Sequence, residues 1–116
     1  MKDFSCVIPL KKDLSETCHL FFSTLANPTR LAILERLREE TLNVSELSEA
    51  LGQEQSMISH NLKPLTRCRF VLAERRGKER RYTLNRDTME PLFKIIENHA
   101  EKHCPTKGKC RALRRE

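Results

Sequence analysis

The stretch that decides the fold runs from residue 43 to residue 65 and reads NVSELSEALGQEQSMISHNLKPL. Apolar residues recur at helical spacing in both of its halves. They are Leu47 and Leu51 in the first half and Ile58, Leu62 and Leu65 in the second. Ser45 is the expected N-cap of the first helix, and Gly52 stands where helices commonly end. Two short helices joined by a tight turn are typical of a helix-turn-helix.

The next residues change from helical to alternating periodicity. The segment FVLAERRGKERRYTL, residues 70–84, alternates apolar and polar residues on both sides of Arg76-Gly77-Lys78. This pattern predicts a β-hairpin with a basic tip. A helix-turn-helix followed directly by a hairpin is a winged helix, so the expected fold class is mainly α with a small β-hairpin.

Helical periodicity also marks the segments on either side. Residues 14–25 and 87–103 each carry an apolar stripe, and a helix should start after Asn27, with Pro28 in its first turn, and stop near Thr41. Pro64 lies inside the second helix of the helix-turn-helix, where it would kink that helix after His60 unless it merely shapes the packing of Leu65 against the core, which is the interpretation we favour. We expect a flexible arm over residues 1–12, one domain over 13–104 and a basic, cysteine-containing tail over 105–116.

Charge and composition narrow the class of function. The net charge is +6, and residues 67–86 hold eight basic residues against two acidic ones. Such a concentration suits a polyanion, because each neutralised phosphate releases counterions. With 33% charged and 5% aromatic residues, the core of a monomer would be thin, so a partner subunit would stabilise it. No glycine-rich phosphate loop, catalytic carboxylate pair or activated nucleophile is evident, which argues against an enzyme.

The winged-helix pattern assigns the DNA contacts. Polar residues near the start of the second helix should reach base edges in the major groove, and the hairpin should lie along the flanking backbone or in the minor groove. The candidates are Gln53, Gln55, Ser56, Ser59, His60 and Lys63 on and before the helix, and Arg75, Arg76, Lys78, Arg80 and Arg81 on the hairpin.

Three runs together resemble the ArsR/SmtB family of winged-helix repressors. They are LANPTRLAILERL at residues 25–37, the stretch at residues 43–65 with its Ser-x-x-Ser-His-x-Leu-Lys run, and ERRGKERRYTL at residues 74–84. The resemblance covers about residues 14–103. It implies a homodimer built from the first and last helices, bound to double-stranded operator DNA with two-fold symmetry. It also implies release when a metal, a metalloid or a thiol-directed signal is sensed.

The family's sensing positions match this sequence only in part. Many members carry thiolates in the third helix, where this chain has residues 43–48 without cysteine. Others bind zinc or cobalt through Asp-x-His on the last helix, where this chain has Asp87-Thr88-Met89. A cysteine cluster at the end of the last helix is similar to that of some arsenic-sensing relatives. The candidate ligands here are Cys104, Cys110, Cys18, His103 and His99.

The chemistry of the ligands leaves several inducers open. Trivalent arsenic prefers three thiolates, so Cys104 and Cys110 would need Cys18, or else Cys6 on the arm. Zinc or cadmium would accept two sulfurs together with a histidine. No cofactor is required for DNA binding itself. The alternative is a purely structural role, in which Cys18 is a core residue and His99 and His103 only complement the helix dipole.

Two other functions remain open at this point. In the first, Cys104 and Cys110 form a disulfide or polysulfide bridge in a redox-sensing or reactive-sulfur-sensing repressor, although Glu35 or its neighbours replace the second-helix thiol of such relatives. In the second, the chain is a constitutive nucleic-acid-binding module. The N-terminus shows no signal-peptide pattern and no segment is apolar enough to cross a membrane, so we expect a cytoplasmic protein with no membrane partner.

Overall fold

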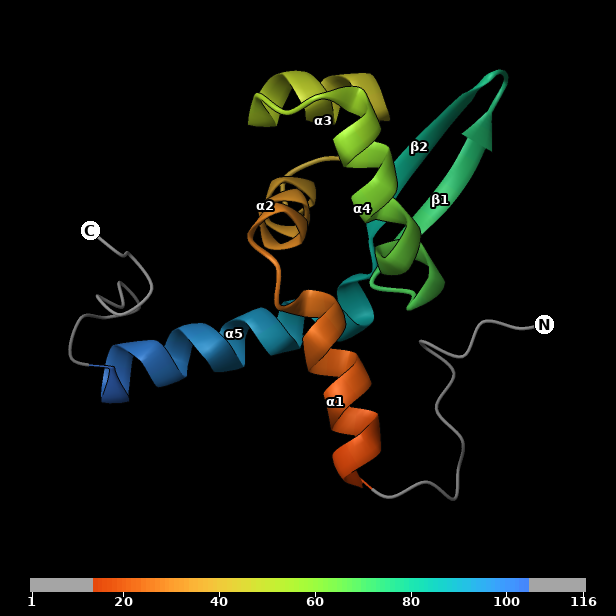
Figure 1. The fold of residues 1–116 in the computed structure, drawn as a ribbon. Helices are drawn as coiled ribbons and strands as arrows, with labels where there is room; N and C mark the ends of the chain where they lie inside the picture. The colour runs from red at the N-terminus through yellow and green to blue at the C-terminus, as the bar shows by residue number, and fades with distance from the viewer. Residues whose placement is uncertain (1–13, 105–116) are drawn as a thin grey trace. The chain divides into compact units, whose positions relative to one another are not determined.

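The computed structural model describes residues 14–104 of the 116-residue chain, so the predicted arm and tail lie outside the described residues. Its elements are α1 (Leu14–Leu25), α2 (Pro28–Leu37), α3 (Val44–Leu51), α4 (Gln55–Arg67), β1 (Val71–Arg76), β2 (Glu79–Leu84) and α5 (Arg86–His103). The chain divides into two compact units, with α1 to β2 in the first and α5 in the second. Figure 1 shows α2, α3 and α4 gathered together with the hairpin beside α4. The predicted order of elements and the winged helix are confirmed.

The start of α2 follows the sequence prediction, whereas its end does not. Asn27 Oδ1 accepts a hydrogen bond from Arg30 N at 3.0 Å, and Pro28 occupies the first turn. The helix stops at Leu37, earlier than the expected Thr41, because a tight turn follows in which Arg38 N and Glu39 N donate to carbonyls three residues back.

The N-cap of α3 is Asn43, so the prediction of Ser45 was wrong. Asn43 Oδ1 accepts from Glu46 N at 2.7 Å, and Asn43 N donates to Glu46 Oε1 at 3.0 Å. These two bonds form a capping box and satisfy two backbone donors. At the other end, Gly52 adopts φ 65°, a left-handed conformation that glycine reaches without steric cost.

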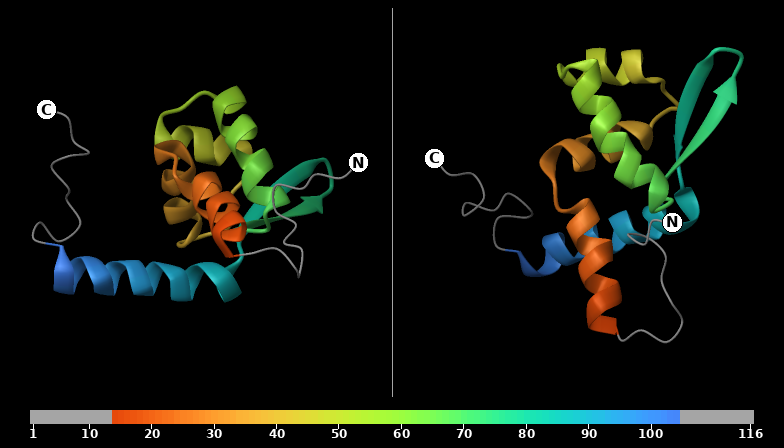
Figure 2. Two further views of the ribbon diagram at one scale, coloured as in Figure 1. Left: turned by 60° about the horizontal axis from the view of Figure 1, so that its bottom comes forward. Right: turned by 45° about the vertical axis from the view of Figure 1, so that its right-hand side comes forward.

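The second helix of the motif, α4, continues through Pro64 to Arg67. Its predicted buried row of Ile58, Leu62 and Leu65 is confirmed, each being at most 2% exposed. After the helix the chain turns sharply, with Arg69 at φ 62° and Phe70 N donating to Leu65 O at 3.0 Å. Figure 2 shows from two sides how this turn leads from α4 into β1.

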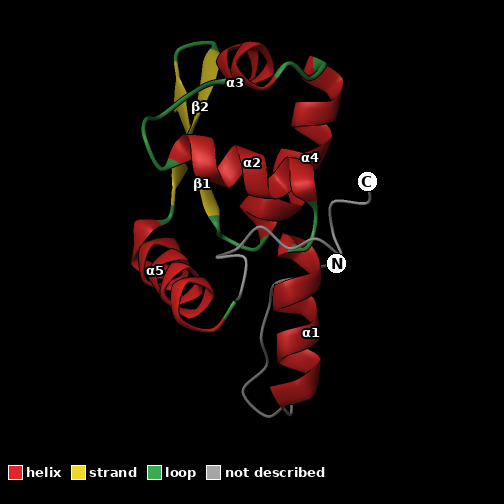
Figure 3. Ribbon diagram, turned by 90° about the vertical axis from the view of Figure 1, so that its left-hand side faces the viewer, coloured by secondary structure: helices red, strands yellow, loops and turns green. Residues whose placement is uncertain are grey.

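The hairpin forms the wing. Arg76 in β1 pairs with Glu79 in β2, which leaves Gly77-Lys78 as a two-residue turn, and Gly77 has φ 66°. An isolated bridge ties Leu42 to Tyr82, with Tyr82 N donating to Leu42 O at 2.8 Å. The base of the wing is therefore fixed to the segment between α2 and α3 (Figure 3).

Aliphatic side chains from several elements make up the core of the first unit. Ile33 and Leu34 of α2, Leu47 of α3 and Val71 of β1 are all fully buried. Phe21 of α1 meets Phe70 edge to face, with ring centroids 5.1 Å apart. None of the helices within residues 14–104 is long and apolar enough to cross a bilayer.

Candidate nucleic-acid interface

A polar and basic stripe runs along the side of α4 that is opposite its buried row. Counting from Ser56, its members follow at i+4, i+7 and i+11, which places them on one face of a helix, and all four are exposed. They are Ser56, His60, Lys63 and Arg67. The sequence prediction included the first three and missed Arg67, although its spacing of four from Lys63 was a usable signal.

Two of the three other predicted residues on this side are Gln53, in the turn before α4, and Gln55, its first residue. Gln55 Nε2 donates to Ser45 Oγ at 3.1 Å, which joins α4 to α3. Gln53 stands in the turn, where its backbone N donates to Ser48 O at 3.2 Å and its carbonyl accepts from Ser48 Oγ. The turn is therefore held by its backbone, and the Gln53 side chain is exposed.

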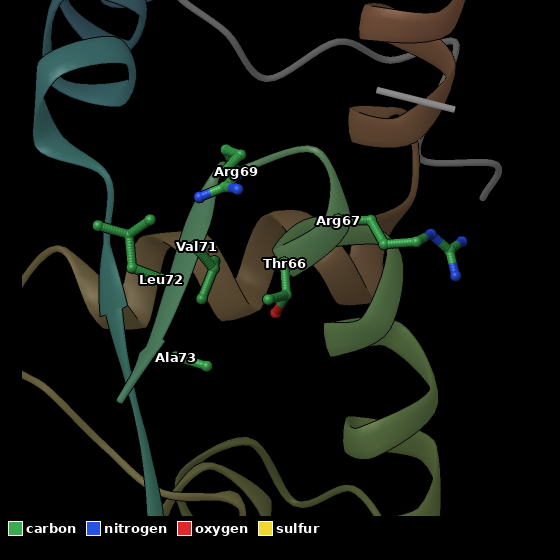
Figure 4. Close-up of a pocket in the computed structure, with 6 residues that line it drawn as sticks. All are labelled: Thr66, Arg67, Arg69, Val71, Leu72 and Ala73. Carbon is green, nitrogen blue, oxygen red and sulfur yellow. The ribbon is translucent and has the colours of Figure 1, made fainter. Parts of the chain in front are cut away.

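Ser59 lies on the side of α4 that faces the wing, where a pocket of about 250 Å³ separates the helix from β2. Its lining residues are Ser59, Leu62, Lys63, Thr66, Arg67, Arg80 and Tyr82. A second pocket of about 310 Å³ lies between the end of α4 and β1 (Figure 4). There the side chains of Arg67 and Arg69 point in different directions, so basic groups flank the helix end on two sides.

Four of the five predicted basic residues of the wing are exposed to solvent, namely Arg75, Arg76, Lys78 and Arg80. Arg76 lies 3.7 Å from Glu74, and both side chains are more than half exposed, so this ion pair is weak. The tip of the wing therefore presents positive charge outward.

Arg81 differs from the other basic residues of the wing because its guanidinium is turned toward the protein. It pairs with Glu79 at 2.5 Å and with Glu46 of α3 at 3.1 Å, and it donates to Thr41 O at 2.9 Å. The hydrogen bond from Arg81 lowers the pKa of Glu79 below its usual value. The side chain thus joins the wing to the start of α3.

Sequence reasoning also missed a polar network behind α4. Arg30 Nε donates to Asn61 Oδ1 at 3.0 Å, and Arg30 Nη1 donates to Thr24 O at 3.0 Å. Asn61 is 4% exposed and also donates from Nδ2 to Met57 O at 2.9 Å. Arg30 thereby ties α4 to the end of α1, and its position three residues after the Asn27 cap gave no hint of a partner in α4.

The candidate metal ligands are only partly within the described residues. His99 and His103 lie one turn apart on α5 with ring centroids 5.1 Å apart, and Cys104, which is not in a disulfide, follows them. Cys18 on α1 is likewise not in a disulfide, whereas Cys110 lies outside the described residues. Within residues 14–104, no three histidine, cysteine or acidic side chains are grouped to hold a metal ion. The described donors alone do not make a complete metal site.

The helix-turn-helix and the first residues of the wing match a family model. Residues 27–72 fit the description "bacterial regulatory protein, arsR family". A regulator of Mycobacterium tuberculosis, the HTH-type transcriptional regulator NmtR, is 38% identical over 93 residues, which are 80% of this chain and 78% of that protein. The chain belongs to the arsR family. It is therefore a DNA-binding transcriptional regulator with a winged helix, and not an enzyme.

Two further similar proteins bear on assembly and on the signal that is sensed. A probable mercury resistance operon repressor of Streptomyces lividans is 31% identical over 97 residues, covering 79% of this chain and 78% of that protein. The solution structure of a homodimeric winged helix-turn-helix DNA-binding domain from Mycobacterium bovis, described as a possible ArsR-family regulator, superimposes with a TM-score of 0.66. It is 25% identical, and the match covers 82% of this chain and 93% of that domain.

Proposed function

We propose that the protein is a homodimeric repressor that leaves its operator when a thiophilic metal ion or arsenite binds near the end of α5. The polar and basic stripe of α4, lying beside a basic wing, is the observation that carries the DNA-binding part. A mercury resistance repressor among the relatives supports a metal signal. Cys104, which is not in a disulfide, follows the His99–His103 pair directly, and this grouping supports placing the metal signal at the end of α5.

On DNA, α4 enters the major groove and the wing follows the flanking backbone. The side chains that reach base edges are Gln53, Gln55, Ser56 and His60, whereas Ser59 faces the wing. Phosphate contacts come from Lys63 and Arg67 of α4 and from Arg75, Arg76, Lys78 and Arg80 of the wing. Arg81, which the sequence placed among the DNA contacts, instead orients the wing because two carboxylates already hold it.

A second copy of the chain completes the operator-binding unit. The homodimeric relative supports this assembly. Large apolar side chains are exposed on α1 and α5, with Phe22 at 55%, Ile95 at 65% and Ile96 at 52%, and a partner subunit would remove them from water. The two α4 helices would then read half-sites about 34 Å apart on an operator with two-fold symmetry.

The inducer-binding ligands are Cys104 and Cys110, completed by Cys18 or by His99 and His103. Three thiolates would suit arsenite, and two thiolates with imidazole would suit zinc or cadmium. A ligand that binds these donors more tightly in one conformation of the dimer would shift the dimer toward that conformation. A coupling of about 1–3 kcal/mol would be enough to weaken operator binding 5- to 150-fold.

The test is a fluorescence anisotropy titration of the reduced protein on DNA from its own promoter, without oxygen. Arsenite, cadmium, zinc and a mild oxidant are then added in separate arms. We expect release by arsenite or by a metal, and loss of that response in Cys104→Ser and in Cys110→Ser with unchanged DNA affinity. Cys18→Ser, made in parallel, separates a three-thiolate site from one completed by the histidines.

The other outcomes distinguish the competing functions. Release by the oxidant alone, abolished by the same two substitutions, would make the chain a thiol-based redox sensor. Persistent binding in every arm would leave a constitutive DNA-binding module. An absence of specific DNA binding by the reduced dimer would contradict the proposal as a whole.

A further inference from the structure

The pocket between α4 and β2 has the composition of an anion site. Its lining includes the cationic side chains of Lys63, Arg67 and Arg80 and the hydroxyl groups of Ser59 and Thr66, with no carboxylate among them. The geometry points to a clamp for one DNA backbone phosphate, held jointly by the recognition helix and the wing. This inference rests on the proposed DNA-binding function and adds to it a defined site, which we call the phosphate clamp.

Two of the clamp's cations, Lys63 and Arg80, have no acidic partner within residues 14–104 and are available for an anion. The adjacent Arg81, by contrast, forms two ion pairs. Successive side chains of a strand point to opposite faces, so β2 sends Arg81 toward α3 and Arg80 toward α4. The strand therefore separates a structural arginine from one that faces the clamp.

The register of the hairpin makes an anion at Arg80 favourable. Arg80 stands directly opposite Arg75 of β1. Like charges at directly opposed positions destabilise a strand pair, and a bound phosphate would offset this repulsion. Arg75 itself does not line the pocket, so the two arginines share charge and strand pairing but differ in access to the clamp.

The walls of the pocket give the clamp a fixed shape. Leu62 is 2% exposed and Tyr82 is 8% exposed, and Tyr82 is held by the bridge to Leu42. A volume of about 250 Å³ is several times the ~30 Å³ share of one water molecule, which leaves space for a phosphate group and its nearest solvent. The cationic and hydroxyl donors of the pocket can all bind phosphate oxygens, and phosphate contacts carry no sequence information, so the clamp fixes the position and orientation of the protein on the duplex.

A double-mutant cycle between protein and DNA tests the clamp. Each phosphate of the operator half-site is replaced in turn by a neutral methylphosphonate, and binding is measured for the wild type, Arg80→Gln, Lys63→Gln and the control Arg75→Gln. We expect one position per half-site at which neutralisation weakens wild-type binding about tenfold but hardly affects Arg80→Gln or Lys63→Gln. Arg75→Gln should bind unmodified DNA more weakly than the wild type does. Neutralising the phosphate at that position should then weaken the binding of Arg75→Gln by the same factor as it weakens wild-type binding.

A salt titration gives an independent readout. Loss of one phosphate contact should reduce the slope of log K against log salt by about 0.9, or about 1.8 for a dimer with two clamps. A merely structural role of Arg80 would lower affinity without a position-specific effect. If the loss of affinity from Arg80→Gln or Lys63→Gln simply adds to the loss from the methylphosphonate at every position, the clamp is overturned and the proposed function remains. If the wild type binds no operator, both are overturned.

Inorganic phosphate in solution presents the same oxygen acceptors as a DNA backbone phosphate, so its binding to the pocket is tested separately. The DNA-free protein is titrated with inorganic phosphate against chloride at equal ionic strength, and the backbone amide NMR signals of Ser59 and Thr66 are followed. Weak, non-saturating shifts are expected for a clamp that works only within the DNA interface. Saturation at submillimolar phosphate would assign the pocket to a free anion and would overturn its assignment to the DNA backbone.

Discussion

At the scale of single residues, Arg30 joins the buried Asn61 of α4 to the end of α1. Arg30→Ala would leave Asn61 Oδ1 buried without this donor and free the Thr24 carbonyl. We expect the free energy of unfolding to fall by about 1–3 kcal/mol, measured by urea denaturation. Arg86→Ala is the matched control, because it removes an exposed helical ion pair with Glu90 worth about 0.3–0.5 kcal/mol. Equal losses in the two variants would contradict the role assigned to Asn61.

The Glu79–Arg81 pair predicts a pH dependence. Because the hydrogen bond from Arg81 lowers the pKa of folded Glu79 below its usual 4.5, the pair stabilises the fold above pH 4.5. This contribution is lost as the pH falls through the lowered pKa. Glu79→Gln should therefore have a lower thermal midpoint than the wild type at pH 7. The difference between the two midpoints should disappear at acid pH.

The control for this pH effect is the same substitution in an Arg81→Gln background. Without the arginine, Glu79→Gln should change the thermal midpoint little and equally at all pH values. A gap that persists unchanged in the Arg81→Gln background would show that some other group lowers the pKa of Glu79.

At the scale of elements, the cap of α3 gives a direct comparison of two side chains. Asn43→Ala removes the acceptor for Glu46 N and should cost about 1 kcal/mol of stability. Ser45→Ala removes only the exposed contact with Gln55 and should cost a few tenths. Chemical denaturation of both variants decides between the two positions, and a larger loss for Ser45→Ala would favour the cap expected from the sequence.

The same helix shows what the sequence can and cannot predict. Asn43-x-x-Glu46 is itself a capping-box pattern, so the information for the correct cap was present in the sequence. The hairpin was predictable because its alternation and its glycine turn are local features. The different roles of Arg80 and Arg81 were not predictable, since Glu46, which decides them, is 35 residues away.

The turn after α4 holds a non-glycine residue in a left-handed conformation. Arg69 has φ 62°, which costs an L-residue about 1–2 kcal/mol, and Gly52 has nearly the same φ of 65°. Arg69→Gly should raise the thermal midpoint, and Gly52→Ala should lower it. Since no atom lies within 4 Å of a Cβ at Gly52, its penalty comes from the backbone alone. Destabilisation by Arg69→Gly would mean that the arginine side chain contributes more than the strain it imposes.

At the scale of the whole molecule, operator affinity depends on two copies acting together. A single α4 reads one half-site. When two copies are linked in a dimer, binding of the first α4 raises the local concentration of the second α4 near its own half-site. Dimerisation therefore increases operator affinity without any new contact. The exposed isoleucines of α5 belong to the interface proposed above. Interfering with them should therefore reduce DNA binding without touching any DNA-contacting side chain.

Ile95→Glu tests this dependence. Ile95 is 65% exposed, so a charge there should leave the fold intact but oppose burial against a second copy. We expect sedimentation equilibrium to show a monomer, and affinity for a two-half-site operator to fall at least tenfold while binding to a single half-site stays the same. Leu72→Glu on β1 is the control, because Leu72 is 41% exposed and lies outside the proposed interface, so that variant should remain dimeric. A dimeric Ile95→Glu protein would exclude Ile95 from the interface, and a monomer with full operator affinity would contradict the need for paired half-sites.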